Sequence, residues 1–280
     1  MQAIFTGIAT ALVTPFTRQH KIDFKALGNL IERQIKMKVD ALLILGTTGE
    51  ISTLTHNERR SIIDFALKIV HGRKPIIFGI GGNDPKSIIE LGQYVAARCS
   101  QYPKIGIMVT APYYNKGTQE GIFHYFQAIT NAVKLPTIIY NIPGRTGVNI
   151  TPETMARLSR LHYVAGIKEA SGNMAQITKV VQLCPNLAVY CGDDTLALPL
   201  YAIGCQGIIS VASNVNVMSV KRIYNAYQQG KVQLALKLFQ RELPFYHSLF
   251  KVVNPIPIKY ELAQLGLIQN ALRLPLEQIK

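Results

Sequence analysis

The sequence is poor in charged residues, in cysteine and in long apolar runs, and each shortage excludes a class of protein. Charged residues make up 16% of the 280 residues and hydrophobic residues 48%, whereas an average globular protein has roughly 25% charged residues. This balance excludes disordered and fibrous proteins. Four cysteines without CxxC spacing are too few for a disulfide scaffold. We expect them to be buried, small apolar side chains: Cys99, Cys184, Cys191 and Cys205.

Two further absences concern membranes and export. Apolar runs such as Ala41–Leu45 fall far short of the ~20 residues that span a bilayer, which excludes an integral membrane protein. The first seventeen residues contain no Lys or Arg, so the basic region of a secretory signal is missing. We therefore expect a cytoplasmic protein without a membrane partner.

Acidic residues are scarce relative to basic ones. Thirty Lys and Arg against 16 Asp and Glu give a net charge of +14, which favours anionic partners such as nucleic acid, acidic membranes or small carboxylates. The basic residues are scattered rather than grouped in a block, so we expect no nucleic-acid partner. The sequence has no HxH, HExxH, GxxxxGK[ST] or GxSxG motif and no GxGxxG after an expected strand. These absences disfavour metal sites, nucleotide cofactors and hydrolase triads.

Eight short apolar runs with β-branched residues predict strands that are buried on both faces. They begin at Gly7, Leu42, Ile76, Ile105, Thr137, Val164, Ala188 and Gly207. The intervening segments have helical periodicity, as in residues 24–37, where Leu27, Leu30 and Ile31 share one face. Strands that alternate with helices at steps of about 20 to 35 residues favour an α/β fold, the (β/α)8 TIM barrel. The alternative is a doubly wound open sheet with a helical tail.

Helix starts are marked by N-cap candidates: Asp23, Thr55, Asp84, Thr118 and Thr151. Pro85 and Pro152 stand at first helical positions, and Glu58 completes a capping box with Thr55. Beyond the eighth strand the pattern is helical, from about residue 219 to 250 and again from 257 to 265. At roughly 150 residues per domain the length corresponds to two domains, unless a barrel uses it as one. We expect a catalytic barrel over residues 1–218 and a C-terminal helical subdomain over residues 219–280.

Polar groups follow the expected strands at the rim where the active sites of such barrels lie. Lys168 ends an apolar run, where desolvation would lower the pKa of its amine and make it a Schiff-base nucleophile. From its position alone, a lysine that snorkels to solvent or pairs with Glu169 is the favoured alternative. Tyr140 ends the neighbouring strand and could transfer protons, or it could be a packed tyrosine with a locally satisfied hydroxyl.

Two turns at this rim could bind carboxylates. The GTTGE turn (Gly46–Glu50) combines glycines, which let backbone N–H groups approach a ligand, with the hydroxyls of Thr47 and Thr48. A GxxG turn alone is a weak signal. Arg145 follows Tyr140 in a Pro/Gly turn and could bind a carboxylate bidentately, although most loop arginines are merely solvated.

The rim motifs, taken together and in order, resemble those of the pyruvate-dependent lyase and synthase superfamily. They are GTTGE, APYYN, YNIPGRTG, GIKEASGN, CGDD, GIISVASN and NPIPIK. Within the superfamily they are most similar to the dihydrodipicolinate synthase family, also called the 4-hydroxy-tetrahydrodipicolinate synthase family. The similarity runs from Gly7 to about Pro275. N-acetylneuraminate lyases share the lysine and the tyrosine, but typically have Ser-Thr in the first turn and lack the arginine of YNxPxRT.

The resemblance implies a class I aldolase-type lyase that condenses pyruvate with L-aspartate 4-semialdehyde in lysine and diaminopimelate biosynthesis. Lys168 would form the Schiff base with pyruvate and Tyr140 would be the proton shuttle. Thr48 and Tyr114 would complete a proton relay, with Tyr114 reaching the site of a neighbouring subunit across a tight dimer. The implied assembly is a homotetramer, a dimer of tight dimers.

The resemblance also implies the residues that bind substrate. Thr47 and Thr48 would hold the pyruvate carboxylate, and Arg145 would hold the carboxylate of the semialdehyde. Ile209 would line the pocket, and Gly192 would border the substrate. No metal or organic cofactor is implied. The alternative functions are another pyruvate-dependent aldolase of the family, such as N-acetylneuraminate lyase, and a catalytically silent barrel that acts as a binding protein.

Two departures from the resembled family bear on regulation and on the chain end. Of the polar residues that form an allosteric lysine pocket in lysine-inhibited synthases, His56, Asn83 and Tyr113 are retained. Three other positions differ: Ile51 replaces a serine, Arg59 a histidine and Ser87 a glutamate that would pair with the lysine ammonium. We therefore expect weak or absent inhibition by lysine. After LRLPLEQIK the sequence ends, where relatives usually continue with another helix.

Overall fold

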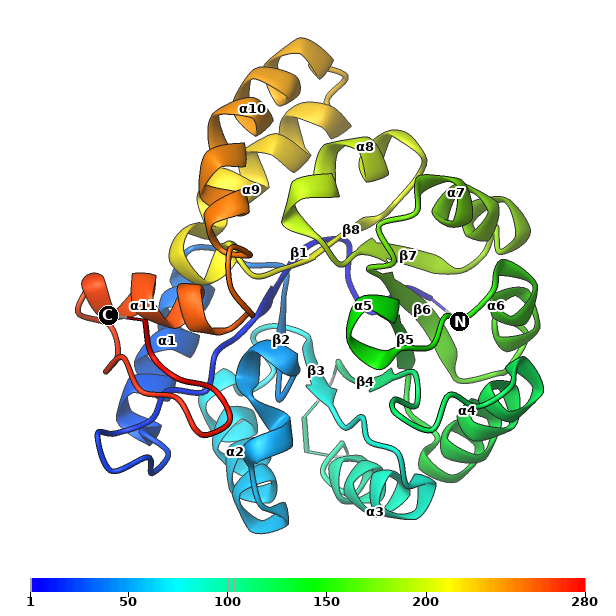
Figure 1. Ribbon diagram of the computed structural model, residues 1–280, viewed down its shortest axis with the longest axis horizontal. Helices are drawn as coiled ribbons and strands as arrows, with labels where there is room; N and C mark the ends of the chain where they lie inside the picture. Colours follow the sequence, from blue (N-terminus) through cyan, green and yellow to red (C-terminus); the bar gives the residue numbers. More distant parts are fainter. Residues whose placement is uncertain (1, 100, 103, 280) are drawn as a thin grey trace.

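The computed structural model describes residues 2–99, 101–102 and 104–279. Its centre is a closed barrel of eight parallel strands, in which β1 pairs with both β2 and β8 (Figure 1). The strands are β1 (Gly7–Ala11), β2 (Ala41–Ile44), β3 (Ile76–Gly79), β4 (Ile105–Thr110), β5 (Thr137–Asn141), β6 (Val164–Glu169), β7 (Ala188–Cys191) and β8 (Gly207–Ser210). The β1–β8 pairing confirms the predicted barrel and excludes an open sheet.

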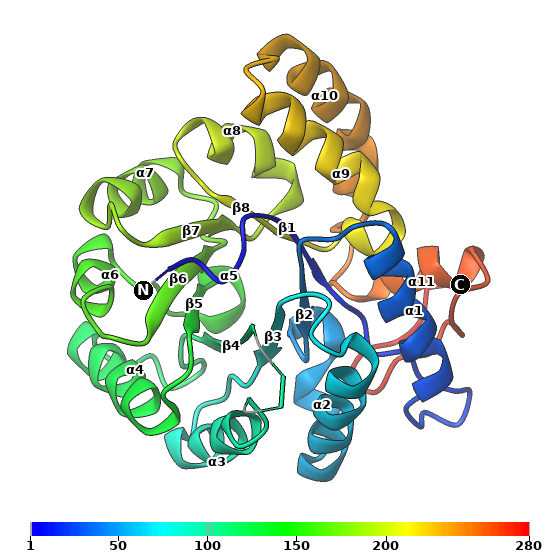
Figure 2. The ribbon, with the colours of Figure 1, turned by 180° about the vertical axis from the view of Figure 1, so that it is seen from behind.

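Helices alternate with the strands and surround the barrel (Figures 1 and 2). They are α1 (Phe24–Lys36), α2 (His56–Val70), α3 (Pro85–Ala96), α4 (Gln119–Val133), α6 (Pro152–Leu158), α7 (Met174–Leu183) and α8 (Ala197–Ala202). The five predicted N-caps are confirmed, because each side chain accepts a hydrogen bond from a backbone N–H in the first turn of its helix. The capping box of Thr55 and Glu58 is present as well.

Among the described residues, three short 3₁₀ turns and one short helix lie in the loops after the strands. The turns are η1 (Thr47–Gly49), η2 (Ile51–Thr53) and η3 (Asp194–Leu196), and the helix is α5 (Pro143–Thr146). In Figure 1 the short helix α5 lies in front of the barrel centre, whereas in Figure 2 the N-terminal segment that leads to β1 crosses in front of the barrel. Figure 1 therefore looks onto the carboxyl ends of the strands.

The chain after β8 is helical, as expected. It forms α9 (Ser213–Gln228), α10 (Val232–Ser248) and α11 (Ile256–Gln264). The helix α9 packs against α10 and β1 and carries a kink at Asn216, whose backbone is not helical. The expected boundary between residues 218 and 219 therefore falls inside α9, just beyond the kink. In both ribbon views α11 lies beside α1, so the C-terminal segment returns to the barrel (Figures 1 and 2).

The apolar core has two shells, one between the strands and the helices and a smaller one inside the barrel. Inside the barrel Phe5 stacks on Tyr190 with ring centroids 4.3 Å apart, and the Tyr190 hydroxyl donates to the Phe5 carbonyl. Cys184, Cys191 and Cys205 are buried as expected, while Cys99 is half-buried; all four are free thiols. No helix within the described residues is long and apolar enough to span a membrane.

Candidate active site

Lys168 lies at the end of β6 and is almost completely buried, with 5% of its surface exposed. Burial excludes a side chain that snorkels to solvent. The pairing with Glu169 is also excluded, because the Glu169 carboxylate accepts hydrogen bonds from Asn141 and from the backbone of Ser171 instead. Burial lowers the pKa of the Lys168 ammonium to about 8, and nearby Asp194 offsets this only in part. Part of the Lys168 population therefore carries an uncharged amine near neutral pH, and this form can act as a nucleophile.

Tyr140 is the neighbour of Lys168 in the barrel. The two residues are in register across β5 and β6, and the Lys168 Nζ lies 4.2 Å from the centre of the Tyr140 ring. Burial raises the pKa of the Tyr140 hydroxyl well above its usual range, while Arg145 and the Thr47 side chain act in the opposite direction. The phenol is therefore protonated at neutral pH and can donate a proton beside the amine.

Gly192 follows β7 and leaves the space that the lysine side chain needs. A Cβ at this position would lie 2.8 Å from the Ala170 Cβ, 3.0 Å from the Glu169 carbonyl oxygen and 3.1 Å from the Lys168 Cε. The Gly192 N–H donates to that same carbonyl at 2.8 Å. A larger residue would therefore displace the backbone of β6 beside Lys168.

The GTTGE turn lies after β2 and carries the two threonines. Thr48 is buried, and its Oγ1 accepts a hydrogen bond from the Asn254 Nδ2 at 3.0 Å. Thr47 is the threonine whose side chain acts on the Tyr140 hydroxyl. Glu50 ends the turn in the left-handed region at φ 54°. The resemblance gave the relay role to Thr48, whereas the threonine side chain that lowers the pKa of the Tyr140 hydroxyl is that of Thr47.

Arg145 lies on α5, which faces the carboxyl ends of the strands (Figure 1). Its side chain is exposed, and its Nη2 donates to the Asn254 carbonyl oxygen at 2.9 Å. A guanidinium has five N–H donors in a planar fork, so the remaining donors can bind a carboxylate.

Ile209 and Tyr114, two further predicted site residues, have opposite surroundings. Ile209 is completely buried in the inner core together with Tyr140. Tyr114 is 86% exposed on the loop between β4 and α4, and its backbone N–H donates to the Thr146 carbonyl. Tyr114 therefore extends from the surface of its own chain instead of lying in the barrel interior.

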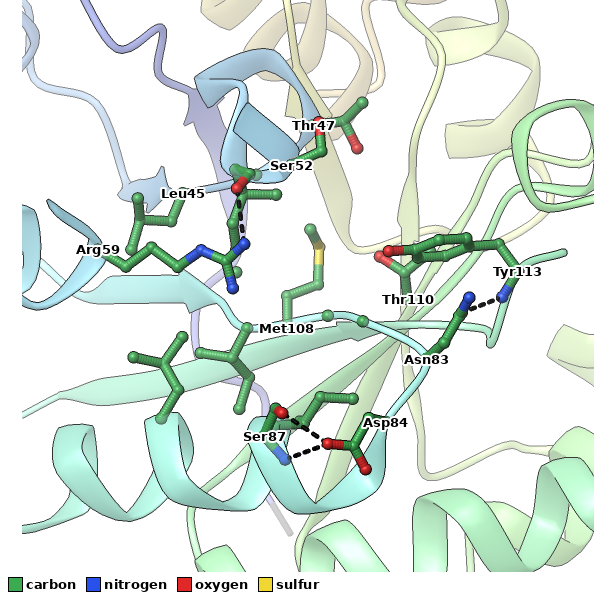
Figure 3. A pocket seen from close by; sticks show the side chains of 18 of the residues that line it. Leu45, Thr47, Ser52, Arg59, Asn83, Asp84, Ser87, Met108, Thr110 and Tyr113 are labelled. Atoms are coloured by element: carbon green, nitrogen blue, oxygen red, sulfur yellow. Dashed lines mark hydrogen bonds between the residues drawn. The ribbon is translucent and has the colours of Figure 1, made fainter. Parts of the chain in front are cut away.

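A cavity of about 470 Å³ opens beside Thr47 and Arg145 and extends between α2 and α3. All six positions compared with the lysine pocket line it: Ile51, His56, Arg59, Asn83, Ser87 and Tyr113. Figure 3 shows Arg59 pointing into this cavity, with Asp84 and Ser87 at its lower edge. Arg59 donates to the Ile51 carbonyl at 3.0 Å, and Ser87 donates to the Asp84 carboxylate at 2.6 Å. The Asn83 side chain accepts from the Tyr113 backbone.

Three residues of the C-terminal segment contact the GTTGE turn, and no role was predicted for them from the sequence. Asn254 and Lys259 belong to the NPIPIK motif, and Arg273 lies beyond α11. Lys259 pairs with Glu50, and both side chains are completely buried. The Arg273 N–H donates to the other Glu50 oxygen at 3.1 Å. The NPIPIK motif could be seen in the sequence, but its spacing did not indicate that its residues contact the GTTGE turn.

Comparison with known proteins shows the family of the chain over almost its full length. The model of the dihydrodipicolinate synthetase family matches residues 4–280. The chain belongs to this family. The 4-hydroxy-tetrahydrodipicolinate synthase of Alkaliphilus oremlandii is 44% identical over 274 residues, which cover 98% of this chain and 93% of the relative.

Solved structures of family members have the same fold. The dihydrodipicolinate synthase of Bacillus anthracis superposes with a TM-score of 0.95 at 37% identity, covering 100% of this chain and 94% of that one. The chloride-inhibited synthase of Acinetobacter baumannii, complexed with pyruvate, gives a TM-score of 0.94 at 34% identity, with 98% and 94% covered. These members therefore share the entire barrel and the C-terminal helices.

Proposed function

We propose that this chain condenses pyruvate with L-aspartate 4-semialdehyde, the reaction of a 4-hydroxy-tetrahydrodipicolinate synthase, which is a lyase of lysine and diaminopimelate biosynthesis. The observation that carries this proposal is the buried Lys168, whose pKa is lowered to about 8 beside the protonated Tyr140. An amine nucleophile and a proton donor at one point are what Schiff-base formation with a ketone requires. The choice of these two substrates rests on membership of the family.

Lys168 acts as the nucleophile. Its neutral amine adds to the keto carbon of pyruvate, and the resulting carbinolamine loses water to give an iminium. Loss of a proton from the methyl group gives an enamine, whose carbon forms the new C–C bond with the aldehyde carbon of the semialdehyde. The aldehyde oxygen takes up a proton. The amino group of the semialdehyde then attacks the iminium carbon, closes the ring and releases Lys168.

Tyr140 transfers the protons of these steps, with Thr47 beside it. The effect of the Thr47 side chain, which lowers the pKa of the Tyr140 hydroxyl, supports Thr47 as the threonine of the relay, because the Thr48 hydroxyl is held by Asn254. Tyr114 of a neighbouring subunit completes the relay. Its 86% exposure on a loop supports this, because an exposed tyrosine is available to another chain.

Two carboxylate sites hold the substrates. Thr48, together with the N–H groups of the GTTGE turn, holds the carboxylate of pyruvate close to Lys168, and Arg145 holds the carboxylate of the semialdehyde. Ile209 forms the apolar wall, and Gly192 leaves room for the lysine adduct. The exposed guanidinium of Arg145, anchored by one hydrogen bond, supports its role as a carboxylate ligand.

We propose that the active species is a homotetramer, a dimer of tight dimers. The proposed compartment is the cytoplasm, where thiols stay reduced; the four free cysteines support this. The proposed chemistry uses the lysine amine and proton transfer, with pyruvate bound covalently during turnover.

Borohydride reduction in the presence of pyruvate, followed by intact and peptide mass spectrometry, tests the first step. We expect a single pyruvate adduct on Lys168, no adduct in Lys168→Ala, and an unchanged adduct in Lys179→Ala, which alters an exposed lysine. A second assay with semialdehyde or N-acetylneuraminate as the second substrate distinguishes the synthase from a lyase of the same superfamily. Absence of an adduct from folded protein, together with salt-dependent binding to DNA or heparin, would favour the silent barrel.

A further inference from the structure

Asn254 connects two turns of the site that are distant in the sequence. It lies in the loop between α10 and α11 and is 6% exposed. Its side-chain Nδ2 donates to the Thr48 Oγ1 at 3.0 Å. Its backbone carbonyl accepts from the Arg145 Nη2 at 2.9 Å. One residue of the C-terminal segment therefore touches both residues proposed to hold a substrate carboxylate.

The side-chain contact fixes the direction of the Thr48 hydroxyl. A threonine hydroxyl has one O–H donor and two acceptor lone pairs. Because Thr48 accepts from Asn254, its own proton points elsewhere. Within the described part of the chain the structure shows no acceptor for that proton. The O–H of Thr48 is thus left free to donate to a carboxylate, while the oxygen is held in place.

The backbone contact restrains Arg145 by different means. Arg145 stands on the four-residue helix α5, and its side chain is exposed. An exposed arginine loses considerable rotamer entropy when it is ordered. The hydrogen bond to the Asn254 carbonyl fixes one nitrogen of the guanidinium in advance. This contact does not depend on the Asn254 side chain, so a side-chain substitution separates the two effects.

We propose that Asn254 is a positioning residue for the pyruvate site: its side-chain amide orients the Thr48 hydroxyl toward the pyruvate carboxylate, while its carbonyl positions Arg145. The proposal rests on the proposed function, because it assigns the ligand of Thr48. It requires that the amide donates to Thr48 and does not accept from it. The direction of that hydrogen bond is therefore the property to be tested.

The first experiment compares Asn254→Ala and Asn254→Asp in steady-state kinetics. We expect kcat/KM for pyruvate to fall about 10- to 100-fold in Asn254→Ala, since a small misplacement of a binding group has effects of this size. The KM for the semialdehyde should change less than about twofold, because the carbonyl that holds Arg145 remains. Asn254→Asp has nearly the same size, but an ionised carboxylate cannot donate a hydrogen bond to the Thr48 Oγ1. Its negative charge also repels the carboxylate of pyruvate. We expect a larger loss in this variant than in Asn254→Ala.

A double-mutant cycle shows whether Asn254 acts through Thr48. Thr48→Val removes the hydroxyl, and in this background Asn254→Ala should cause no further loss in kcat/KM for pyruvate. Asn225→Ala, an exposed position on α9, is the matched control and should behave like the parent enzyme. Thermal unfolding of each variant checks the fold. If Asn254→Ala does not fold, the near-isosteric Asn254→Asp carries the comparison.

Three outcomes would overturn the inference. They are parental activity in Asn254→Asp, multiplicative losses in the cycle, and an equal rise of KM for both substrates, which is what a merely structural role predicts. Failure of the proposed function is recognised separately, because the parent enzyme itself would then give no condensation product. In that case the rate of borohydride trapping with pyruvate still compares Asn254→Ala with the parent.

Discussion

At the scale of single residues, the buried position of Lys168 sets the pH dependence of the first chemical step. Below its pKa of about 8 the amine is protonated and cannot attack a ketone. We expect the initial rate of adduct formation to rise roughly tenfold per pH unit below that value and to level off above it. Initial rates of borohydride trapping between about pH 6 and about pH 10 measure this. A rise that continues to the ordinary lysine value of 10.5 would contradict it.

Arg145 gives a second prediction at this scale. Arg145→Ala should leave the pyruvate adduct on Lys168 largely intact and raise the KM for the semialdehyde. A hydrogen bond to a charged group contributes about 1.5–3 kcal/mol, which corresponds to roughly 10- to 100-fold in affinity. Steady-state kinetics with both substrates and adduct mass spectrometry measure the two effects.

Two further variants serve as comparisons. The KM of Arg145→Lys for the semialdehyde should be intermediate, because an ammonium lacks the planar fork. Arg160→Ala, at an exposed position, is the control. Loss of the adduct in Arg145→Ala would show that the assigned role is wrong.

At the scale of elements, the helix α11 is tied to the GTTGE turn by a buried ion pair. Both Lys259 and Glu50 are completely buried. The Lys259 Nζ also donates to the Ala271 carbonyl at 2.9 Å, and it lies 4.1 Å from the centre of the Phe16 ring. The pair therefore joins the substrate-binding turn, α11 and the segment that follows it.

Breaking this pair from one side should be costly, whereas replacing both partners should not. Lys259→Met leaves the Glu50 carboxylate buried without its ammonium partner, and we expect a loss of about 3–5 kcal/mol in the free energy of unfolding. Glu50→Gln with Lys259→Met removes both charges and should recover most of that loss. Urea unfolding at a fixed protein concentration measures both variants. A single variant as stable as the parent would contradict the expected cost, as would a double variant no more stable than the single one.

The elements themselves were predictable because their signals are local. A strand buried on both faces requires a continuous apolar run, and Ile76, Thr137, Val164 and Gly207 each begin both a run and an observed strand. Helix starts were predictable for the same reason, since an N-cap is defined by one side chain and the next turn. The start of α9 was placed near Ser219 instead of Ser213 because the kink at Asn216 interrupts the periodicity.

The contacts that hold the site could not be predicted from such local signals. Asn254 and Thr48 are 206 positions apart, and Lys259 and Glu50 are 209 apart. Their meeting depends on how the C-terminal helices return to the barrel. Likewise, the strand pattern placed Lys168 next to Tyr140, but only the packed barrel shows that the Thr47 side chain acts on the pKa of the tyrosine hydroxyl. The catalytic and binding roles of these residues stay predictions.

At the scale of the whole molecule, the cavity between α2 and α3 bears on feedback regulation. The ammonium of a bound lysine would meet Ser87 and the Arg59 guanidinium there. Asp84, which also lines the cavity, already accepts from Ser87 and from the backbone of α3.

Loss of a charged partner for an ammonium costs about 1.5–3 kcal/mol. We expect no inhibition at micromolar lysine and a gain of sensitivity in Ser87→Glu with Arg59→His. Initial rates at increasing lysine measure both, and strong micromolar inhibition of the parent would contradict the expectation.

Assembly is the property that decides whether one chain can work alone. Lys168 is buried in the barrel, whereas Tyr114 is 86% exposed on its own surface. If Tyr114 serves a neighbouring subunit, a chain with Lys168→Ala can supply the tyrosine to a chain with Tyr114→Phe. Each single variant alone should be nearly inactive.

Subunit mixing tests this directly. In an equal mixture of Lys168→Ala and Tyr114→Phe chains, half of the dimers are hybrid, and one of the two sites in each hybrid is complete. We therefore expect recovery of about a quarter of the parental activity. Analytical ultracentrifugation of the same samples shows the oligomer in which the recovery occurs. If Tyr114 acts within its own chain, mixing restores no activity, because every chain then lacks either the lysine or the tyrosine of its own site.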